Sequence, residues 1–579
     1  MLEIKDTFYL NGEELQIISA SFHYFRTVPE YWRDRLEKLK NMGCNTIETY
    51  IPWNFHEEKR GQYRFDGIRD ICAFIELVQE LDMYMIVRPS PYICSEWEFG
   101  GLPAWLLKDR NMRLRCSYEP YLQAVKEYYE VLIPMLVPYQ IDRGGNIILV
   151  QIENEYGYYG NDKAYLEFLR DTMRELGITV PFVTSDGPWK ESGFKAGCVE
   201  GALPTGNFGS DAAKQFPAME QYIGKKVPLM CMEFWNGWFD AWGEGHHTTS
   251  AEAAAKELDE ILSRGHVNFY MGEGGTSFGF MSGRNAGNTT CDITSYDYDG
   301  PLSEDGQMTE KYYACQKVIR KYRDFEEMPL SMEIQRKSYG SLTLKKRVGL
   351  FQTLEDIAKP IRSAYPLTME EIDQSVGYML YRIQATPEEK VLNIQLEGAN
   401  DRTQVYQNGV LSFVDGFDNR GCFYESKEPV TAPVIDLLCE NMSRENFGTG
   451  LDEQRKGISK GVKLNEHYHY GYEIYSLPFD EEQIAKLNFD KDYEEGQPSF
   501  SLFELEIDEV ADTFLDFTGF GKGCAFVNGF NIGRFWEIGP QRRLYIPAPL
   551  LKKGLNQIIL FETEGKTSDS VSLCDGGVF

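Results

Sequence analysis

The sequence lacks the features that mark proteins acting on nucleic acids or in membranes. It contains no run of basic residues, and its 89 acidic and 59 basic residues leave a formal net charge of -30. Such a charge opposes binding to polynucleotides and to anionic lipid surfaces. No stretch approaches the ~18 uninterrupted apolar residues that a membrane-spanning helix needs. We therefore expect neither nucleic acid nor membrane as a partner.

Signatures of metal sites and disulfide frameworks are also scarce. The seven histidines form only the clusters His246–His247 and His467/His469, each without a third ligand in register. The 12 cysteines are scattered without a C-x-x-C pair, and the first twenty residues show no basic segment followed by an apolar one, as a secretory leader would. The sequence thus predicts a cytoplasmic protein with reduced thiols that needs no metal or other cofactor.

The chain is long and rich in aromatic residues. Tyr, Phe and Trp make up 14% of the 579 residues, which suits both large cores and the recognition of sugar ring faces. Over roughly the first 325 residues, apolar runs alternate with amphipathic helical stretches. The apolar runs cover residues 16–24, 44–53, 83–93, 146–155, 181–187, 203–209, 228–235 and 266–275.

This alternation predicts a (β/α)8 TIM barrel over residues 1–330. The rival is an open doubly wound sheet, which is disfavoured because no G-x-G-x-x-G follows the first strand. Four helical stretches are expected between the strands, and three of them end in glycine, a common helix stop. They cover residues 30–43, 67–82, 162–177 and 250–265.

After residue 330 the pattern changes to alternating strand-like segments. Asn408-Gly409 and Asn528-Gly529 are hairpin turn signals in similar sequence frames, 120 residues apart. They indicate two all-β domains of the jelly-roll or sandwich type, predicted at 331–485 and 486–579 and joined by the acidic segment "FDKDYEEGQPSF".

Polar side chains follow the predicted strand "NIILV" directly. Gln151, Glu153, Asn154 and Glu155 crowd within five residues of its end. Burying unpaired carboxylates is costly, so these groups either satisfy one another or face a cavity. In a barrel, the loops after the strands build the active site, which favours the cavity.

The ends of other predicted strands add further carboxylates and aromatic rings. Opposed carboxyl groups suit glycoside hydrolysis, in which one protonates the leaving oxygen and the other attacks the anomeric carbon or activates water. The chain shows neither a G-x-S-x-G nucleophile elbow nor a phosphate-binding loop. The residues that gather at these ends are Tyr50, Arg88, Glu96, Glu98, Glu233, Trp235 and Trp238.

Several motifs resemble those of the β-galactosidases of glycoside hydrolase family 35. They occur in order as "ASFHYFR", "TYIPWNFHE", "RPSPYICSEWEFGGLPAWLL", "QIENEYGYYG", "TSDGPW", "MEFWNGWFDAWG" and "TSYDYDGPLSEDG". The later segments with Asn-Gly turns resemble that family's galactose-binding-like jelly-roll domains. The resemblance implies a retaining exo-β-galactosidase, which removes terminal β-linked galactose from oligosaccharides or glycoconjugates through a covalent galactosyl-enzyme intermediate.

The resemblance also implies roles for individual residues. Glu155 of "ENE" matches the general acid/base, and Glu233 of "MEFW" matches the nucleophile. Trp235 follows the nucleophile and either shapes the leaving-group site or packs. Ser95 stands where the family has alanine. The positions that match the lining of the galactose pocket are Tyr50, Ile93, Cys94, Glu96, Asn154 and Tyr298.

Other acidic residues have competing interpretations. Glu153 is predicted to be a structural carboxylate, whereas Glu98 either binds substrate or braces a loop. The family usually shows "FHGGTNFG" after the last barrel strand, where this chain reads "GEGGTSFG". Glu273 therefore replaces a histidine and Ser277 an asparagine, close to the expected mouth of the barrel.

Two alternative functions remain open. An exo-β-glucosaminidase would favour a carboxylate beside the 2-amino group of its sugar, whereas this chain offers the neutral Asn154 there. A sugar-binding protein without activity is conceivable because of Glu273, but both predicted catalytic glutamates are present. The motifs specify neither a β-1,3 nor a β-1,4 linkage, and a homo-oligomer is compatible with them.

Overall fold

The first half of the chain closes into a parallel barrel. The computed structural model describes residues 2–416 and 420–579. The barrel strands are β4 (Ile18–Phe22), β5 (Thr46–Tyr50), β6 (Tyr84–Arg88), β7 (Ile147–Gln151), β8 (Phe182–Asp186), β9 (Ala202–Asn207), β10 (Met230–Trp235) and β11 (His266–Glu273). Each pairs with the next, and β11 pairs with β4. All eight predicted runs are strands of this barrel, so the (β/α)8 prediction is confirmed.

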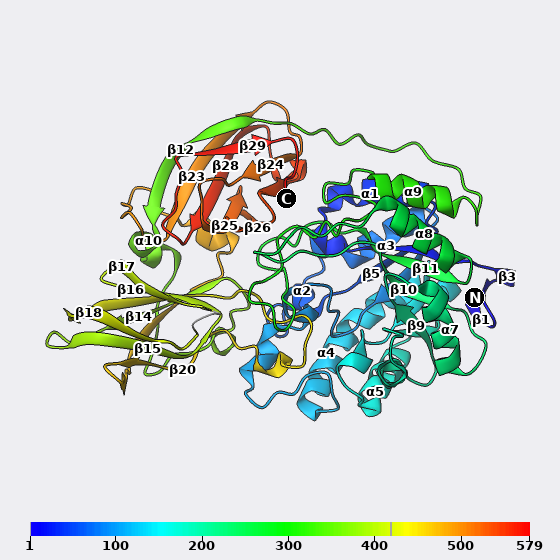
Figure 1. Ribbon diagram of the computed structural model, residues 1–579, viewed down its shortest axis with the longest axis horizontal. Coiled ribbons are helices and arrows are strands. Elements are labelled where there is room, and N and C mark those ends of the chain that lie inside the picture. Colours follow the sequence, from blue (N-terminus) through cyan, green and yellow to red (C-terminus); the bar gives the residue numbers. More distant parts are fainter. Residues whose placement is uncertain (1, 417–419) are drawn as a thin grey trace.

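Helices surround the barrel (Figure 1). The predicted stretches form α1 (Pro29–Met42), α3 (Ile71–Glu80), α5 (Lys163–Glu175) and α8 (Ala251–Leu262). The other helices of this half are α2 (Trp53–His56), α4 (Glu119–Leu136), α6 (Glu191–Gly197), α7 (Ala212–Ile223) and α9 (Glu310–Ile319). Asp162 and Ser250 cap α5 and α8 by accepting a backbone N–H three residues on, and Gly43 ends α1 with a φ of 109°.

One end of the barrel is closed by the start of the chain. The strands β1 (Leu2–Ile4), β2 (Phe8–Leu10) and β3 (Glu13–Glu14) form a small sheet there. Leu2 and Phe8 pack with apolar residues of the barrel interior, and the Phe8 ring lies 4.7 Å from that of His266, the first residue of β11. Because this plug occupies the amino-terminal end of the strands, their carboxyl-terminal end is left for a site.

The second domain is a sandwich of two antiparallel sheets. One sheet has the order β13 (Ile361–Ser363), β22 (Tyr472–Leu477), β14 (Tyr378–Gln384), β19 (Val434–Glu440), β16 (Arg402–Gln407) and β17 (Val410–Asp415). The other has the order β18 (Phe423–Thr431), β15 (Lys390–Asn400), β20 (Gly457–Leu464) and β21 (His467–Tyr468). Buried side chains of both sheets, among them Ile383, Leu396 and Leu437, share one core.

The third domain is built on eight hydrogen-bonded strands. In sheet order they are β26 (Phe530–Trp536), β25 (Lys522–Val527), β28 (Gly554–Glu562), β23 (Ser499–Ile507), β12 (Gly340–Gly349), β29 (Ser570–Cys574), β24 (Thr513–Asp516) and β27 (Arg543–Ile546). The short helices α10 (Leu350–Ile357) and α11 (Glu481–Ala485) lie in the segments that connect the second and third domains.

The strand β12 corrects the predicted domain boundary at residue 331. Residues 340–343 pair with β29 and residues 344–349 with β23, so this strand belongs to the third domain although it precedes the second. In Figure 1 a long connection from α9 carries the chain to it. The second domain is thus inserted into the third. The sequence pattern identified the strand correctly, but strand partners are set by long-range pairing that a local pattern does not contain.

Both predicted Asn-Gly turns are two-residue hairpin loops. Gln407 pairs with Val410 across the first, and Val527 with Phe530 across the second. The asparagines have φ values of 50° and 51°, and the glycines 78° and 90°. Positive φ at both central positions is the type I′ geometry that matches the twist of a hairpin.

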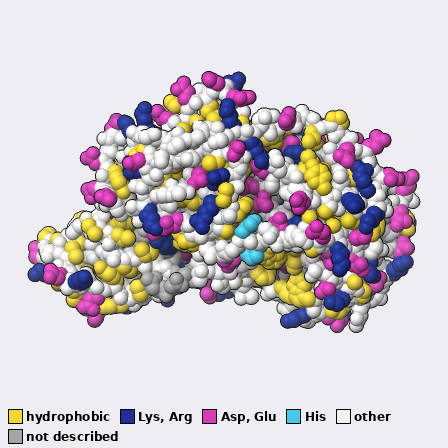
Figure 2. Space-filling view, turned by 45° about the horizontal axis from the view of Figure 1, so that its top comes forward, with side chains coloured by type: hydrophobic (Ala, Val, Ile, Leu, Met, Phe, Trp, Pro, Cys, Tyr) yellow, Lys and Arg dark blue, Asp and Glu magenta, His cyan; other side chains and the backbone are white. Residues whose placement is uncertain are grey.

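The surface agrees with the composition. On the face shown in Figure 2, Lys and Arg side chains are interspersed with Asp and Glu rather than gathered into one basic patch. Among the helices of the described residues, none has both the length and the apolar character needed to cross a bilayer.

Candidate active site

A cavity lies at the carboxyl-terminal ends of the barrel strands. Its volume is about 200 Å³, below the roughly 300–1,000 Å³ of sites for drug-sized ligands, so it suits a single sugar ring. Nine of the ten predicted site residues line it: Tyr50, Cys94, Ser95, Glu96, Asn154, Glu155, Glu233, Trp235 and Tyr298. The other lining residues are Tyr158, Trp189, Trp238, Phe239, Tyr270, Asn285 and Phe447.

The backbone around this cavity is held in an unusual conformation. The five lining residues Cys94, Ser95, Glu96, Glu155 and Tyr298 have φ values between 45° and 61°. Non-glycine residues seldom adopt this left-handed region, and such strain concentrates at functional sites. The strand ends are therefore bent to aim these side chains, which a regular strand could not do.

Glu233, in β10, is surrounded by hydrogen-bond donors. Its Oε1 accepts bonds from the Tyr50 hydroxyl at 2.9 Å and from Arg88 Nη2 at 2.6 Å, and its Oε2 accepts one from Trp235 Nε1 at 3.1 Å. The carboxyl group is almost fully buried, and the Arg88 guanidinium beside it is completely so. These three hydrogen bonds, one of them from a guanidinium, fix the orientation of the carboxyl group in the cavity.

Glu155 lies in a different environment just beyond β7. Its Oε1 accepts one hydrogen bond, from Asn207 Nδ2 at 3.1 Å. Burial in the cavity wall, followed by the negative charge of Glu233, raises the pKa of Glu155 to about 8. One carboxyl group held by three donors and a second whose pKa is raised, both in one cavity, suit the roles of a nucleophile and a general acid.

Asn154 is oriented by its neighbours. Its Oδ1 accepts bonds from Arg88 Nη2 at 2.6 Å and Gln151 Nε2 at 3.2 Å, which directs its amide N–H groups to the cavity. Glu96 accepts a hydrogen bond from the Tyr296 hydroxyl, and burial raises its pKa to about 7. The site therefore offers both a fixed donor and a titrating carboxyl group to a sugar's hydroxyls.

Glu153 is a structural residue, as predicted. Both of its oxygens bind Arg115, each at 2.9 Å, and Oε1 also accepts a bond from the Tyr165 hydroxyl at 2.9 Å. Glu153 and Arg115 are at most 2% exposed. Neither lines the cavity.

Three further residues of the quoted motifs lie outside the sugar cavity or have a structural role. Ile93 does not line the cavity; it is fully buried, and its side chain lies against the turn at Gly101. Glu98 binds Arg444 of the second domain through both its oxygens, which is the loop-bracing alternative. Trp242, the last tryptophan of the "MEFWNGWFDAWG" motif, packs into the core of the third domain and does not line the cavity.

Some lining residues were missed because they come from distant segments. Asn285, in the long loop after β11, pairs its backbone with Phe447 of the second domain at the cavity's edge. Neither lies in a motif that marks a site. Trp189 of "TSDGPW" and Tyr158 of "YGYYG" stood in quoted motifs, and their aromatic character was an available signal.

Metal ligands do not gather in the described part of the chain. Within residues 2–416 and 420–579, His, Cys, Asp and Glu side chains form no group of three or more that could hold an ion.

Comparison with known proteins identifies the family of this chain. Residues 7–322 match the model of glycosyl hydrolases family 35. The chain belongs to glycoside hydrolase family 35. Residues 366–478 match the first all-beta domain of beta-galactosidases, and residues 498–556 match the beta-galactosidase galactose-binding domain. The protein is thus a glycoside hydrolase of the β-galactosidase family, and a galactose-containing carbohydrate is the substrate that this family implies.

Full-length relatives support the same assignment. The family-35 chain is 38% identical to the human "Beta-galactosidase-1-like protein 2" over 576 residues, which cover 96% of this chain and 88% of the relative. It is 37% identical to the human "Beta-galactosidase", with 98% and 88% covered. It is also 37% identical to "Beta-galactosidase 17" of Arabidopsis thaliana, with 96% and 86% covered.

Two departures from the family-35 pattern meet on one guanidinium. Arg26 Nη1 donates to the hydroxyl of Ser95 at 3.0 Å, and its Nε donates to the hydroxyl of Ser277 at 3.1 Å. Nη2 also donates to the backbone carbonyl of Ser95 at 2.6 Å. The two serines thus act together to hold the loop that carries Glu96 into the cavity.

The third departure, Glu273, does not face the mouth of the barrel. Its side chain is fully buried, accepts hydrogen bonds from the Thr27 hydroxyl and lies 3.6 Å from Arg35 Nε. Burial raises the pKa of Glu273 to about 7, against the opposing charge of Arg35. In this family-35 enzyme the substitution belongs to the packing between the barrel wall and α1 and not to the sugar cavity.

Proposed function

We propose that this enzyme is a retaining exo-β-galactosidase that hydrolyses terminal non-reducing β-D-galactose through a covalent galactosyl-enzyme intermediate. The observation that supports this best is the divergence of its two cavity carboxyl groups. Glu233 accepts hydrogen bonds from three donors, one of them Arg88, whereas the pKa of Glu155 is raised to about 8. One group is suited to attack, and the other holds a proton at neutral pH.

In the first step, the Glu155 carboxyl transfers its proton to the glycosidic oxygen while the bond from the anomeric carbon to that oxygen breaks. The Glu233 carboxylate bonds to the anomeric carbon from the opposite face, and the aglycone leaves as an alcohol. Asn154, oriented by Arg88 and Gln151, can donate to the sugar 2-hydroxyl, a contact that strengthens in the transition state.

In the second step, Glu155 acts as the base because Glu233 has lost its negative charge. Once Glu233 is esterified it is neutral, so the electrostatic contribution that raises the pKa of Glu155 disappears. The Glu155 carboxylate then takes a proton from water, the resulting oxygen attacks the anomeric carbon, and Glu233 leaves as a carboxylate. Two inversions at one carbon give net retention.

Exo action is supported by the size and walls of the cavity. It has room for about one ring, and aromatic side chains border it. Trp189 and Trp238 are 45% and 40% exposed, so they lie where the cavity meets solvent. A pocket of this kind accepts a chain end, whereas cleavage inside a chain needs an open groove.

The test is the stereochemistry and position of cleavage. Proton NMR of the first-formed sugar should show β-galactose before mutarotation, and an oligosaccharide should release only its terminal galactose. The first appearance of α-galactose would overturn the covalent mechanism, and early internal fragments would overturn exo action.

The two alternatives have less support. A glucosaminidase would favour a carboxylate beside the 2-amino group of its sugar, where this site has the amide of Asn154. An inactive sugar-binding protein was suggested by Glu273, which lies outside the cavity. Comparing turnover of aryl β-galactosides, β-glucosides and β-glucosaminides distinguishes all three.

We further propose that the enzyme works in the cytoplasm. All twelve cysteines are free thiols, and seven of them are buried, as suits a reducing compartment. Cell fractionation with an antibody against the native chain tests this, and enzyme recovered mainly from a secretory compartment would contradict it.

A further inference from the structure

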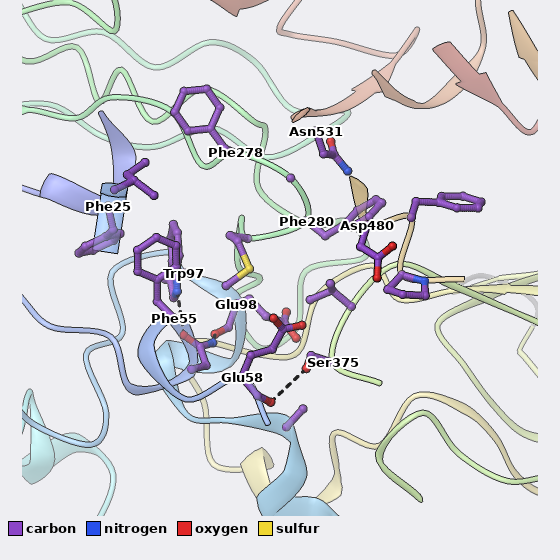
Figure 3. Close-up of a pocket in the computed structure, with 18 of the residues that line it drawn as sticks. Phe25, Phe55, Glu58, Trp97, Glu98, Phe278, Phe280, Ser375, Asp480 and Asn531 are labelled. Carbon is purple, nitrogen blue, oxygen red and sulfur yellow. Dashed lines mark hydrogen bonds between the residues drawn. The ribbon is translucent and has the colours of Figure 1, made fainter. Parts of the chain in front are cut away.

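A second cavity of about 300 Å³ lies where the three domains meet (Figure 3). We call it the junction cavity. It shares no lining residue with the sugar cavity. Its walls come from the barrel, from Ser375 and Val376 of the second domain, from the connecting residues Phe479 and Asp480, and from the third domain.

Aromatic rings of the barrel form one wall. Phe25 lies edge-on to Trp97 with ring centroids 4.7 Å apart, and Phe55 approaches the same ring at 5.9 Å. Phe278 and Phe280, in the loop after β11, bound the cavity from the other side in Figure 3. Such a surface favours an apolar or aromatic ligand body.

The second Asn-Gly turn supplies the wall from the third domain. Gly529, Phe530 and Asn531 line the cavity, and the Phe530 ring packs on Phe278 at 5.3 Å. Phe530 is still 36% exposed. The turn at Asn528-Gly529 does not line the sugar cavity. Its contact with Phe278 instead closes the junction cavity between the third domain and the barrel.

The charged groups that line the junction cavity are mainly acidic. Arg444 is engaged by Glu98 and by Glu370, and Arg69 stacks on Phe55 with its Nε bound to a backbone carbonyl. The lining carboxylates are Glu58, Glu98, Asp480 and Glu481, against the two guanidiniums Arg69 and Arg444. Glu58 and Glu481 are exposed. The cavity thus combines an apolar interior with an acidic rim.

The junction cavity and the sugar cavity lie on two sides of one loop. Trp97 and Glu98 line the first, and the preceding residues Ser95 and Glu96 line the second. Arg26, which holds the carbonyls of Ser95 and Glu96, follows Phe25 of the aromatic wall directly. A ligand that fixes the rings of Phe25 and Trp97 therefore acts on the segment that positions Glu96.

We propose that the junction cavity is a second ligand site, which takes an organic cation with an apolar body, such as an aryl or alkyl ammonium, and that its occupancy is coupled to the sugar cavity. The guanidiniums of Arg26 and Arg69 already lie over the rings of Phe25, Trp97 and Phe55. The rings therefore contact the apolar body of the ligand, and the acidic rim supplies the attraction for its charge. The binding claim stands by itself, whereas the coupling rests on the proposed galactosidase function.

Binding is tested on the full-length enzyme by titration calorimetry with benzyltrimethylammonium. We expect saturable binding with a Kd on the order of 1 mM or tighter. Benzyl alcohol should bind more weakly, and benzenesulfonate should not bind. A wild-type enzyme that shows no saturable binding of the cation, or that binds the sulfonate equally well, overturns the site.

Two variants locate the site. Glu58→Gln with Glu481→Gln should weaken cation binding about threefold or more at low salt and leave benzyl alcohol unchanged. The matched control is Glu13→Gln with Glu14→Gln, which makes the same charge change on the exposed strand β3. Val376→Trp should fill the cavity and abolish binding of both ligands. Equal weakening by the rim and control pairs would contradict the assignment.

Coupling is tested by titrating a non-hydrolysable thio-β-galactoside with and without saturating benzyltrimethylammonium. We expect the galactoside Kd to change at least about twofold, and reciprocity requires the cation Kd to change by the same factor. An unchanged galactoside Kd overturns the coupling. If the galactoside does not bind at all, the proposed function fails, while the cation titration still decides the junction site.

Discussion

Glu153 and Glu155 lie two residues apart, and replacing each by glycine separates the roles that the structure gives them. Both positions have left-handed backbone, with φ values of 57° and 47°, which glycine adopts without strain. The backbone effect of the two substitutions is therefore similar, and differences between the variants report the lost side chains. Glu155→Gly removes the proposed acid/base, whereas Glu153→Gly removes a buried ion-pair partner.

The structure sets the expected magnitudes. Glu153→Gly leaves the buried Arg115 without its bidentate partner, which should cost about 3–5 kcal/mol of unfolding free energy. At roughly 2 °C per kcal/mol for a large domain, the melting temperature should fall by about 6–10 °C. The Glu155 side chain accepts a single hydrogen bond, from Asn207, so its loss should leave the melting temperature nearly unchanged. It should instead lower disaccharide turnover about 10²–10⁴-fold.

The assay compares two substrates and adds a nucleophile. Glu155→Gly should still react with a dinitrophenyl β-galactoside in the first step, because a good leaving group needs no proton. The second step should then limit the rate, and azide, which needs no base, should restore turnover and yield β-galactosyl azide. Glu153→Gly should lower both substrates alike and show no azide effect. Azide rescue of Glu153→Gly to the β-product, with Glu155→Gly inactive, would refute the assignment.

Three further outcomes follow from individual residues. Because Glu155 must enter the cycle protonated and its pKa is raised to about 8, kcat/KM should be retained below pH 8 and fall as the pH rises above it; a pH-rate profile without this basic limb contradicts the role. Glu273→His should lower the unfolding free energy by about 1–3 kcal/mol, since the buried Arg35 loses one of its two carboxylate neighbours and keeps only Asp34, yet change kcat/KM of the folded enzyme less than about twofold. Calorimetry and initial rates check this, and a larger kinetic effect would place the residue in function. Arg444→Ala should lower the melting temperature and raise KM, because Glu98 and its loop lose their brace to the second domain; Arg110→Ala, which breaks an exposed pair between the same domains, is the control that should change neither.

The sequence predicted the barrel well because its signals are local and repeated. An apolar run such as 147–150 can hardly be anything but a buried strand when it alternates with amphipathic helices that carry their own caps. The order of motifs then pointed to Glu155 and Glu233, which we propose as the catalytic pair. The same reasoning predicted β12 as a strand but assigned it to the wrong domain, because its partners β23 and β29 are distant in sequence. It also predicted that Ile93 lines the cavity, whereas that side chain is fully buried.

What the sequence determined by itself is the set of elements and the chemistry they carry: eight barrel strands, the hairpin turns at Asn408 and Asn528, and two glutamates at strand ends. These depend on residues close together in the chain. The tertiary structure alone decided that Arg115 pairs with Glu153 outside the site, that Glu273 is buried against Arg35 of α1, and that Phe447 reaches the site from another domain. The reason is physical. A carboxylate's role depends on burial and on the charges around it, and those are supplied by segments tens to hundreds of residues away.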